Sequence, residues 1–178
     1  MDQFGNICCR AACISGDMGS TMEKIGNVPD DCHPKIRQLV DYWLSIHPPS
    51  GLPGRRHFDP MDIPMLLPNI CLVDAPTPTA DFSFRLMGSR VETFFGGNFT
   101  GKPFVSAYIK NHRSQAYVDM CGILGDRAPR WRRGPAGLVE NREHVVIERV
   151  YLPLAEDGET VSIILGLILT KLGDAAFL

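Results

Sequence analysis

The amino-acid sequence predicts an α+β fold in which helices cover both faces of a five-stranded antiparallel sheet. Three observations support this prediction. Residues 34–46 carry apolar side chains at helical spacing, residues 82–86 alternate as a half-buried strand does, and residues 161–170 are apolar at almost every position. A strand that is apolar on both sides is central in its sheet and is covered by further structure on each face.

Composition bounds the class of protein. The chain has 178 residues, of which 44% are hydrophobic and 21% are charged, which is ordinary for one globular domain. A net charge of −2 gives no bulk attraction to nucleic acid or to an anionic membrane. No apolar run approaches the roughly 18 residues that span a bilayer, and no secretory signal is visible at the N-terminus. We therefore expect a cytoplasmic protein that binds neither membrane nor nucleic acid.

The chain divides into one domain with two tails. Residues 1–31 mix Gly, Asn, Asp, Ser and Cys without a helical or strand period, which predicts a poorly ordered tail. A single domain is expected over 32–172, followed by a short tail over 173–178. The six cysteines lack the paired spacing of a zinc site, so we expect free thiols and no bound metal.

The first helix is expected to begin after Asp31 or Cys32, with Pro34 in its first turn, and to end by His47. Its apolar stripe has to be buried, either on the sheet of the same chain or on a second subunit. The stripe of this first helix is a candidate dimer interface and consists of Ile36, Leu39, Val40 and Trp43. A short second helix is expected after the N-cap Asp59.

The first two strands are predicted from apolar runs bounded by turn residues. They cover residues 70–74 and 82–87, and the turn between them contains two prolines. Alternation in the second strand places three apolar side chains on one face, namely Phe82, Phe84 and Leu86.

Helices are predicted between these strands and the last three. Ser89 is expected to cap a short helix, and residues 104–125 are expected to form the longest helix of the chain. The remaining strands are expected over 132–140, 144–154 and 161–170, with an Asp157-Gly158 turn before the last. Two strands, a helical crossover and three further strands complete the predicted sheet.

Several short motifs occur in the order typical of one family. They are Leu52-Pro53 with Arg55 or Arg56, Asp59-Pro60 with Ile63-Pro64 and Leu67-Pro68, Asp81-Phe82-x-Phe84-Arg85-Leu86-x-Gly88, Phe95-Gly96-x-x-Phe99-Thr100-Gly101, and Leu152-Pro153-Leu154 before Asp157-Gly158. With the Trp43 helix, they make residues 36–170 resemble the PAS-like domain family of stand-alone bacterial regulatory proteins. The resemblance implies a five-stranded antiparallel sheet cupped by short helices. It also implies sensing or protein docking in place of catalysis.

The cofactors used in that family can be compared with the residues present. Flavin-binding light sensors carry Gly-x-Asn-Cys, whereas Phe99 follows Gly96-Gly97-Asn98 here, so the cysteine that attacks the flavin is missing. Haem sensors use an axial histidine, for which His112 is the candidate. A surface or capping role is the simpler interpretation of His112. We therefore expect no cofactor.

An aromatic-rich set of side chains would line a ligand pocket or fill the core, and we favour the filled core. The set comprises Phe84, Leu86, Phe94, Phe95, Tyr108 and Tyr117. Arg85 alternates away from these rings, where Asp74 or Glu148 would pair with it. The arginine cluster over 127–133 is expected to be a solvated strand entry or a docking patch for an acidic partner.

No Gly-x-Ser-x-Gly elbow, phosphate-binding loop or HExxH motif occurs in the sequence. We therefore predict a non-enzymatic sensory or regulatory module that acts on a partner protein, such as a signalling kinase. It would dock through its sheet or its N-terminal helix and form a homodimer. Two alternatives remain, a sensor of a small apolar ligand or haem, and a small hydrolase or isomerase with a titrating group at the pocket floor.

Overall fold

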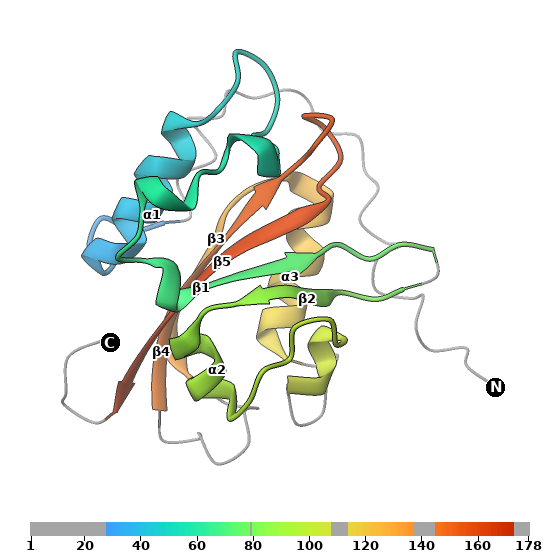
Figure 1. The fold of residues 1–178 in the computed structure, drawn as a ribbon. Helices are drawn as coiled ribbons and strands as arrows, with labels where there is room; N and C mark the ends of the chain where they lie inside the picture. The colour runs from blue at the N-terminus through green and yellow to red at the C-terminus, as the bar shows by residue number, and fades with distance from the viewer. Residues whose placement is uncertain (1–27, 79, 108–113, 137–144, 173–178) are drawn as a thin grey trace.

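The computed structural model describes residues 28–78, 80–107, 114–136 and 145–172. Most of the two expected tails lie outside these ranges, as do Tyr108 and His112. Within them, the chain forms one antiparallel sheet with helices on both sides (Figure 1). The expected α+β class is confirmed.

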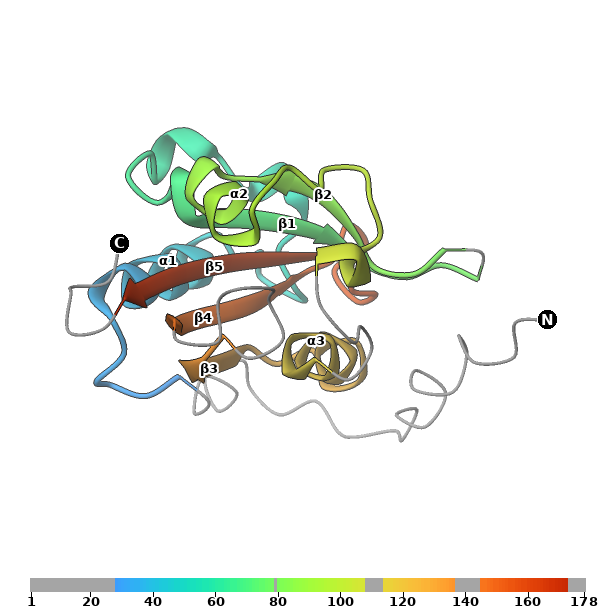
Figure 2. The same ribbon diagram turned by 90° about the horizontal axis from the view of Figure 1, so that it is seen from below.

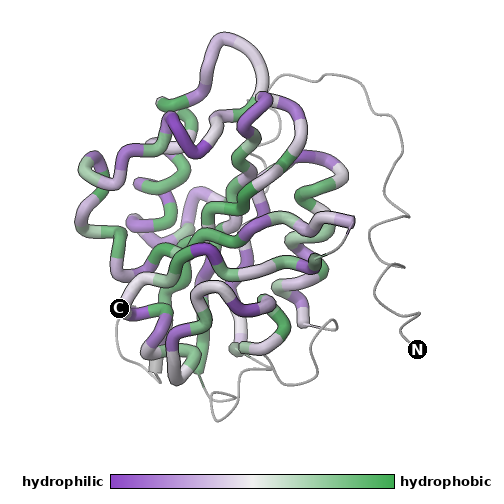
Figure 3. The backbone as a smooth tube through the Cα atoms, turned by 45° about the vertical axis from the view of Figure 1, so that its right-hand side comes forward, coloured by the Kyte–Doolittle hydropathy of each residue, from purple (hydrophilic) through white to green (hydrophobic). Residues whose placement is uncertain are grey.

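The sheet has five strands in the spatial order β2-β1-β5-β4-β3, and every neighbouring pair is antiparallel. The strands are β1 (Ile70–Asp74), β2 (Ser83–Met87), β3 (Arg130–Pro135), β4 (Val145–Leu154) and β5 (Ile163–Leu172). The central position predicted for the last strand is confirmed, because β5 lies between β1 and β4. Figure 3 shows hydrophobic residues following the strands through the middle of the molecule.

One face of the sheet is covered by α1 (Pro34–Ser45), which lies on the opposite side from α3 (Figure 2). His33 is the N-cap, and its Nδ1 accepts a hydrogen bond from the Lys35 amide at 3.1 Å. The predicted apolar stripe is buried in the core of its own chain and consists of Ile36, Leu39, Val40 and Trp43. The Trp43 indole Nε1 donates to the Pro153 carbonyl oxygen at 3.0 Å. The assignment of these four residues to a dimer interface is therefore corrected, since their own sheet already buries them.

The other face is covered by the crossover between β2 and β3. Its elements are α2 (Ser89–Phe95), the 3-10 turn η5 (Phe104–Ala107) and α3 (Gln115–Asp126). The prediction of one helix over 104–125 is wrong, because residues 104–107 form a 3-10 turn and α3 begins at Gln115, with Ser114 as its extended N-cap. The Ser114 Oγ accepts a hydrogen bond from the Tyr117 amide at 3.2 Å and so satisfies a group that the helix leaves unpaired. α2 has Gly88 as its N-cap in place of the expected Ser89.

A β-bulge in β2 reverses the expected alternation of its side chains. Leu86 pairs with Leu72 and Phe84 pairs with Val73, so Arg85 is the extra residue. Phe84 is buried, but Met87 is the next buried side chain and Leu86 is 44% exposed. The prediction that Leu86 shares the face of Phe84 is therefore wrong.

Gly88 and Gly166 are among the positions where neighbouring atoms leave no room for a Cβ atom. At Gly88, a Cβ atom would lie 2.3 Å from the carbonyl oxygen of Leu67. At Gly166 in β5, it would lie 2.7 Å from Cys71 Sγ and 3.0 Å from the Tyr151 ring. The first contact packs the start of α2 on backbone, and the second brings two buried side chains together over the middle strand.

Gly88→Ala is expected to lower the free energy of unfolding by about 1–3 kcal/mol. The new methyl group would clash with the carbonyl oxygens of Leu67 and Pro68, which belong to backbone that has to shift as a unit. Urea denaturation measures the change. Gly134→Ala is the control, since a Cβ atom there meets nothing within 4 Å. Equal losses in the two variants would show that the close approach at Gly88 does not constrain packing.

Candidate functional site

Three of the six predicted pocket residues come together on the α3 side of the sheet. The ring centroid of Phe84 lies 5.9 Å from that of Phe95 and 5.0 Å from that of Phe104. The centroids of Phe94 and Phe95 are 4.9 Å apart. Rings at these separations touch one another, so they stabilise the core through their own packing. We give the name aromatic cluster to these three rings together with the two phenylalanines that pack on them. Its members are Phe84, Phe94, Phe95, Phe99 and Phe104.

The other predicted pocket residues have different surroundings. The ring of Tyr117 packs edge-on against Phe82 at 5.4 Å between centroids, and its hydroxyl donates to Asp81 Oδ1 at 2.9 Å. Leu86 is exposed as a result of the bulge in β2. Tyr108 lies outside the described residues, as does His112, the candidate haem ligand.

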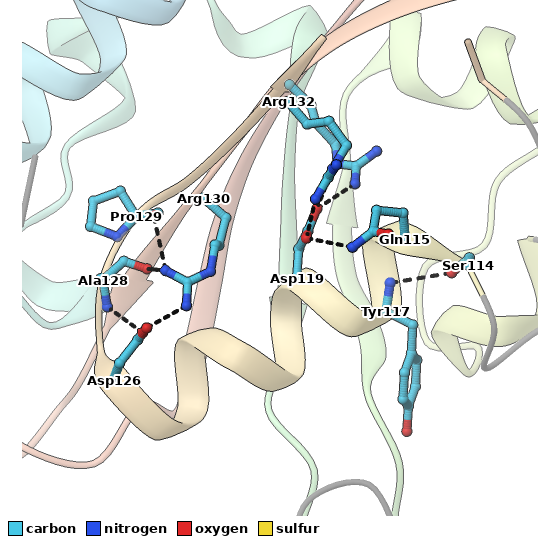
Figure 4. Close-up of polar contacts among 10 residues, drawn as sticks. Ser114, Gln115, Tyr117, Asp119, Asp126, Ala128, Pro129, Arg130 and Arg132 are labelled. Carbon is cyan, nitrogen blue, oxygen red and sulfur yellow. Dashed lines mark hydrogen bonds and ion pairs between the residues drawn. The ribbon is translucent and has the colours of Figure 1, made fainter. Parts of the chain in front are cut away.

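A buried carboxylate, Asp119, attaches α3 to the sheet (Figure 4). Its Oδ1 accepts hydrogen bonds from Arg132 Nη2 at 2.9 Å and from Gln115 Nε2 at 3.0 Å. Its Oδ2 accepts from Arg132 Nε at 3.1 Å and from Arg149 Nη2 at 2.7 Å. The side chains of Asp119 and Arg149 are 7% and 6% exposed, so this ion pair is shielded from water. We call Asp119, Gln115, Arg132 and Arg149 the α3 clamp.

The charge state of Asp119 follows from these contacts. Burial by itself would raise the pKa of this carboxyl, but hydrogen bonds from Arg132, Gln115 and Arg149 outweigh burial and lower the pKa below its usual value. A carboxylate held ionised in this way is a poor general acid or base near neutral pH. Removing one partner of a buried ion pair typically costs about 3–5 kcal/mol, because the other charge is left uncompensated. The α3 clamp is therefore a strong positional constraint on the helix.

A second buried carboxylate, Glu148 on β4, holds the start of α1 on the other face of the sheet. Its Oε1 accepts hydrogen bonds from the His33 amide at 2.8 Å and from Trp131 Nε1 at 3.0 Å. Its Oε2 accepts from Arg133 Nε at 3.0 Å. The same guanidinium reaches Asp31, because Nη2 donates to the Asp31 carbonyl oxygen at 2.8 Å. We call Glu148, Arg133, His33 and Asp31 the α1 clamp.

The arginine cluster over 127–133 is largely neutralised within the chain. Three of its arginines bond carboxylates, namely Arg130 with Asp126, Arg132 with Asp119 and Arg133 with Glu148. Arg130 Nη1 also donates to the carbonyl oxygens of Ala128 and Pro129 (Figure 4). These contacts hold the cluster in the fold, and they reduce the positive charge that would attract an acidic partner or nucleic acid.

Neither clamp is among the site residues predicted from the sequence. Spacing does not show which acidic and basic side chains meet, because Asp119, Arg132 and Arg149 come from three separate elements. One signal is visible in the sequence. Glu148 and Arg149 interrupt an otherwise apolar strand, and charges inside a strand covered on both faces have to be paired.

Cysteine and histidine side chains in the described residues offer little chemistry. Burial raises the pKa of the Cys71 thiol to about 12, so the thiol stays protonated. Burial lowers the pKa of His33 and of His47, and His47 Nδ1 lies 2.8 Å from the Trp43 carbonyl oxygen. Within the described ranges, no group of three or more potential metal ligands is found.

Comparison with known proteins identifies the fold. A family model described as PAS domain matches residues 32–169, which is most of the chain. The chain belongs to the PAS domain family. Membership confirms the resemblance found in the sequence and makes the protein a sensory or regulatory module. No curated protein matches the sequence of this PAS domain. Among its described residues, no helix has the length and apolar character to cross a membrane.

Lowering the pH from about 7.5 to about 5.5 is expected to destabilise this PAS domain, because an unfolded histidine titrates near pH 6.5. His33 and His47 have lowered pKa values in the folded state, so the unfolded chain binds more protons in this interval. Burying the neutral imidazoles stabilises the fold fully at pH values above the histidine pKa of the unfolded chain. This stabilisation is lost as the pH falls from that value through the lower histidine pKa of the folded state. Urea denaturation at several pH values measures this slope.

The double variant His33→Asn/His47→Gln should flatten that pH dependence. Asparagine at position 33 keeps an N-cap side chain for α1, so the comparison tests titration and not loss of the cap. A slope equal to that of the wild-type protein would show that other groups carry the pH dependence.

Proposed function

We propose that this PAS domain is a non-enzymatic regulator that changes the state of a partner signalling protein, such as a kinase, by docking to it. The observation that carries the proposal is a fixed loop with two exposed methionines. Met61 and Met65 are each 77% exposed, whereas Ile63 and Leu66 between and beside them are buried. We call residues 59–66 the methionine loop.

The methionine loop is held firmly on α1. The Tyr42 hydroxyl on α1 accepts a hydrogen bond from the Asp59 amide at 2.8 Å and donates to the Asp59 carbonyl oxygen at 3.1 Å. The Tyr42 ring packs edge-on against Phe58, with centroids 5.8 Å apart. Asp59 Oδ1 accepts from the Met61 amide at 2.9 Å and caps the short turn η3 (Pro60–Asp62). A loop fixed in this way loses little conformational entropy on binding, which favours docking.

Exposed methionine side chains suit a surface that meets another protein. The thioether chain is flexible and polarisable, so it packs against partner surfaces of different shapes. The apolar stripe of α1 is buried, and the chain's own helices cover both faces of the sheet. The methionine loop therefore supports docking beside the N-terminal helix, one of the two places that the sequence suggested.

The state of the buried polar groups supports a non-enzymatic role. Asp119 and Glu148 are bonded to arginines, and the Cys71 thiol stays protonated. Each of these groups holds elements of the fold together or packs in the core. A general base, by contrast, has a pKa near the working pH and points toward the atom from which it takes a proton.

A small-molecule sensor is the alternative, with an apolar ligand or haem bound beside the aromatic cluster. Aromatic walls are typical of such sites. The rings of the aromatic cluster pack directly on one another, however, so a ligand placed among them would have to replace contacts that the core already makes. This packing favours docking over ligand sensing.

Site-specific photo-crosslinking in the native cell tests the docking proposal. A benzophenone amino acid at position 61 or 65 is expected to give one discrete adduct, whereas the same residue at position 118 should not. Val118 is the matched control because it is an exposed apolar residue on α3, away from the methionine loop. An adduct with twice the mass of the chain would identify a second copy as the partner.

The adduct is identified by mass spectrometry, and the identified protein is then purified and assayed. The wild-type PAS domain is expected to change the activity of that protein, and Met61→Ser/Met65→Ser is expected to lose the effect. Equal cross-linking from positions 61, 65 and 118 would contradict the assignment of the methionine loop.

Native mass spectrometry and a visible absorption spectrum together separate docking from ligand sensing. The full chain, purified without denaturation, is expected to show the mass of the polypeptide or of its dimer and no visible absorption band. A bound small molecule, or the absorption band of haem, would favour the sensor and overturn the preference for docking.

A further inference from the structure

We infer that the two clamps are coupled through the paired strands β3 and β4, so that releasing α3 on one face of the sheet loosens the start of α1 on the other. The clamps are neighbours in both strands. Arg132 is the cross-strand partner of Arg149, and Arg133 is the cross-strand partner of Glu148. Because successive side chains in a strand point to opposite faces, these two adjacent pairs serve different sides of the sheet.

On the α3 side, two side chains of like charge lie directly opposite each other. Like charges in this position repel and destabilise the strand pairing. Asp119 offsets the repulsion by accepting hydrogen bonds from both Arg132 and Arg149. Arg149 is buried, so water screens its charge only weakly. The carboxylate of α3 therefore helps to keep β3 in register on β4.

On the α1 side, the adjacent pair attracts. Arg133 Nε bonds Glu148, and the same guanidinium donates to Asp31. Glu148 also accepts the amide hydrogen of His33, the N-cap residue of α1. These bonds run from β3 and β4 to the residues through which the chain enters α1. Their lengths therefore depend on how the two strands lie relative to each other.

The coupling has a defined electrostatic cause. When α3 moves away or Asp119 loses its charge, Arg132 and Arg149 repel and β3 shifts against β4. Arg133 follows Arg132 in the backbone, so this shift weakens its bonds to Glu148 and Asp31. The first turn of α1 then frays. Release of α3 on one face of the sheet would therefore alter the first turn of α1 on the other face, where the N-terminal segment of the sequence joins that helix.

Hydrogen exchange in the full chain tests the coupling. Asp119→Asn removes the negative charge from the α3 clamp and is expected to speed amide exchange at residues 33–37 by about fivefold or more, which is the lower end of ordinary coupling between sites. Asp126→Asn is the matched control, because it removes a half-exposed aspartate–arginine pair at the end of the same helix. The control should leave exchange at residues 33–37 unchanged.

The double variant Asp119→Asn/Arg132→Gln separates charge repulsion from loss of packing. Removing one of the two like charges should restore most of the protection at residues 33–37, although the α3 clamp is still broken. Because coupling is reciprocal, Glu148→Gln should speed exchange in α3 around residues 117–121. The inference is overturned if Asp119→Asn affects α3 alone, if it speeds exchange evenly through β5, or if Arg132→Gln gives no rescue.

If Asp119→Asn does not fold, the reciprocal variant Glu148→Gln tests the coupling by itself. It removes the negative charge that Arg133 and the His33 amide contact and leaves Asp119 and its arginines in place. Faster exchange around residues 117–121 is expected. Unchanged exchange there would overturn the coupling.

Discussion

The pairing of β4 with β5 is the interaction on which the rest of the structure depends. The two strands pair over their full lengths, from Val145 with Leu172 to Leu154 with Ile163. Nearly every described side chain in them is buried, so apolar surface points out of both faces of the sheet. The hydrophobic effect favours a cover on each face, and α1 and α3 supply it. The layered arrangement therefore follows from two strands that are apolar on both sides.

Charged residues within that layer give the arrangement its precision. An apolar stripe fixes which side of a helix faces a sheet, but it tolerates small shifts and rotations of the helix. Contacts to Asp119 and Glu148 restrict such shifts much more, because a carboxylate away from water has to keep its hydrogen-bond donors. The two carboxylates thus position α3 and the start of α1, while the surrounding apolar residues contribute most of the driving force for folding. The regulatory role of the family is compatible with such attachments, because a few contacts determine where each helix lies.

The parts of this fold that could be predicted depend on local patterns. The central place of β5 follows from its unbroken apolar run, and the burial of Trp43 and Leu39 follows from helical spacing. Periodicity defines the face of a helix and not what covers it, so the sequence left open whether a second subunit would bury that stripe. The exposure of Leu86 depends on a bulge, which is a property of two paired strands and is not visible in one of them. Both clamps join elements distant in sequence, and their partners become apparent only in three dimensions.

Gly166 has a consequence for how this sequence can diverge. Cys71, Gly166 and Tyr151 lie side by side across β1, β5 and β4, and the large ring of Tyr151 occupies the space beside a residue without a side chain. A descendant chain can enlarge position 166 only after the side chains at positions 71 and 151 have made room, since the reverse order passes through an overfilled core. Substitutions at positions 71, 151 and 166 should therefore be correlated among related chains.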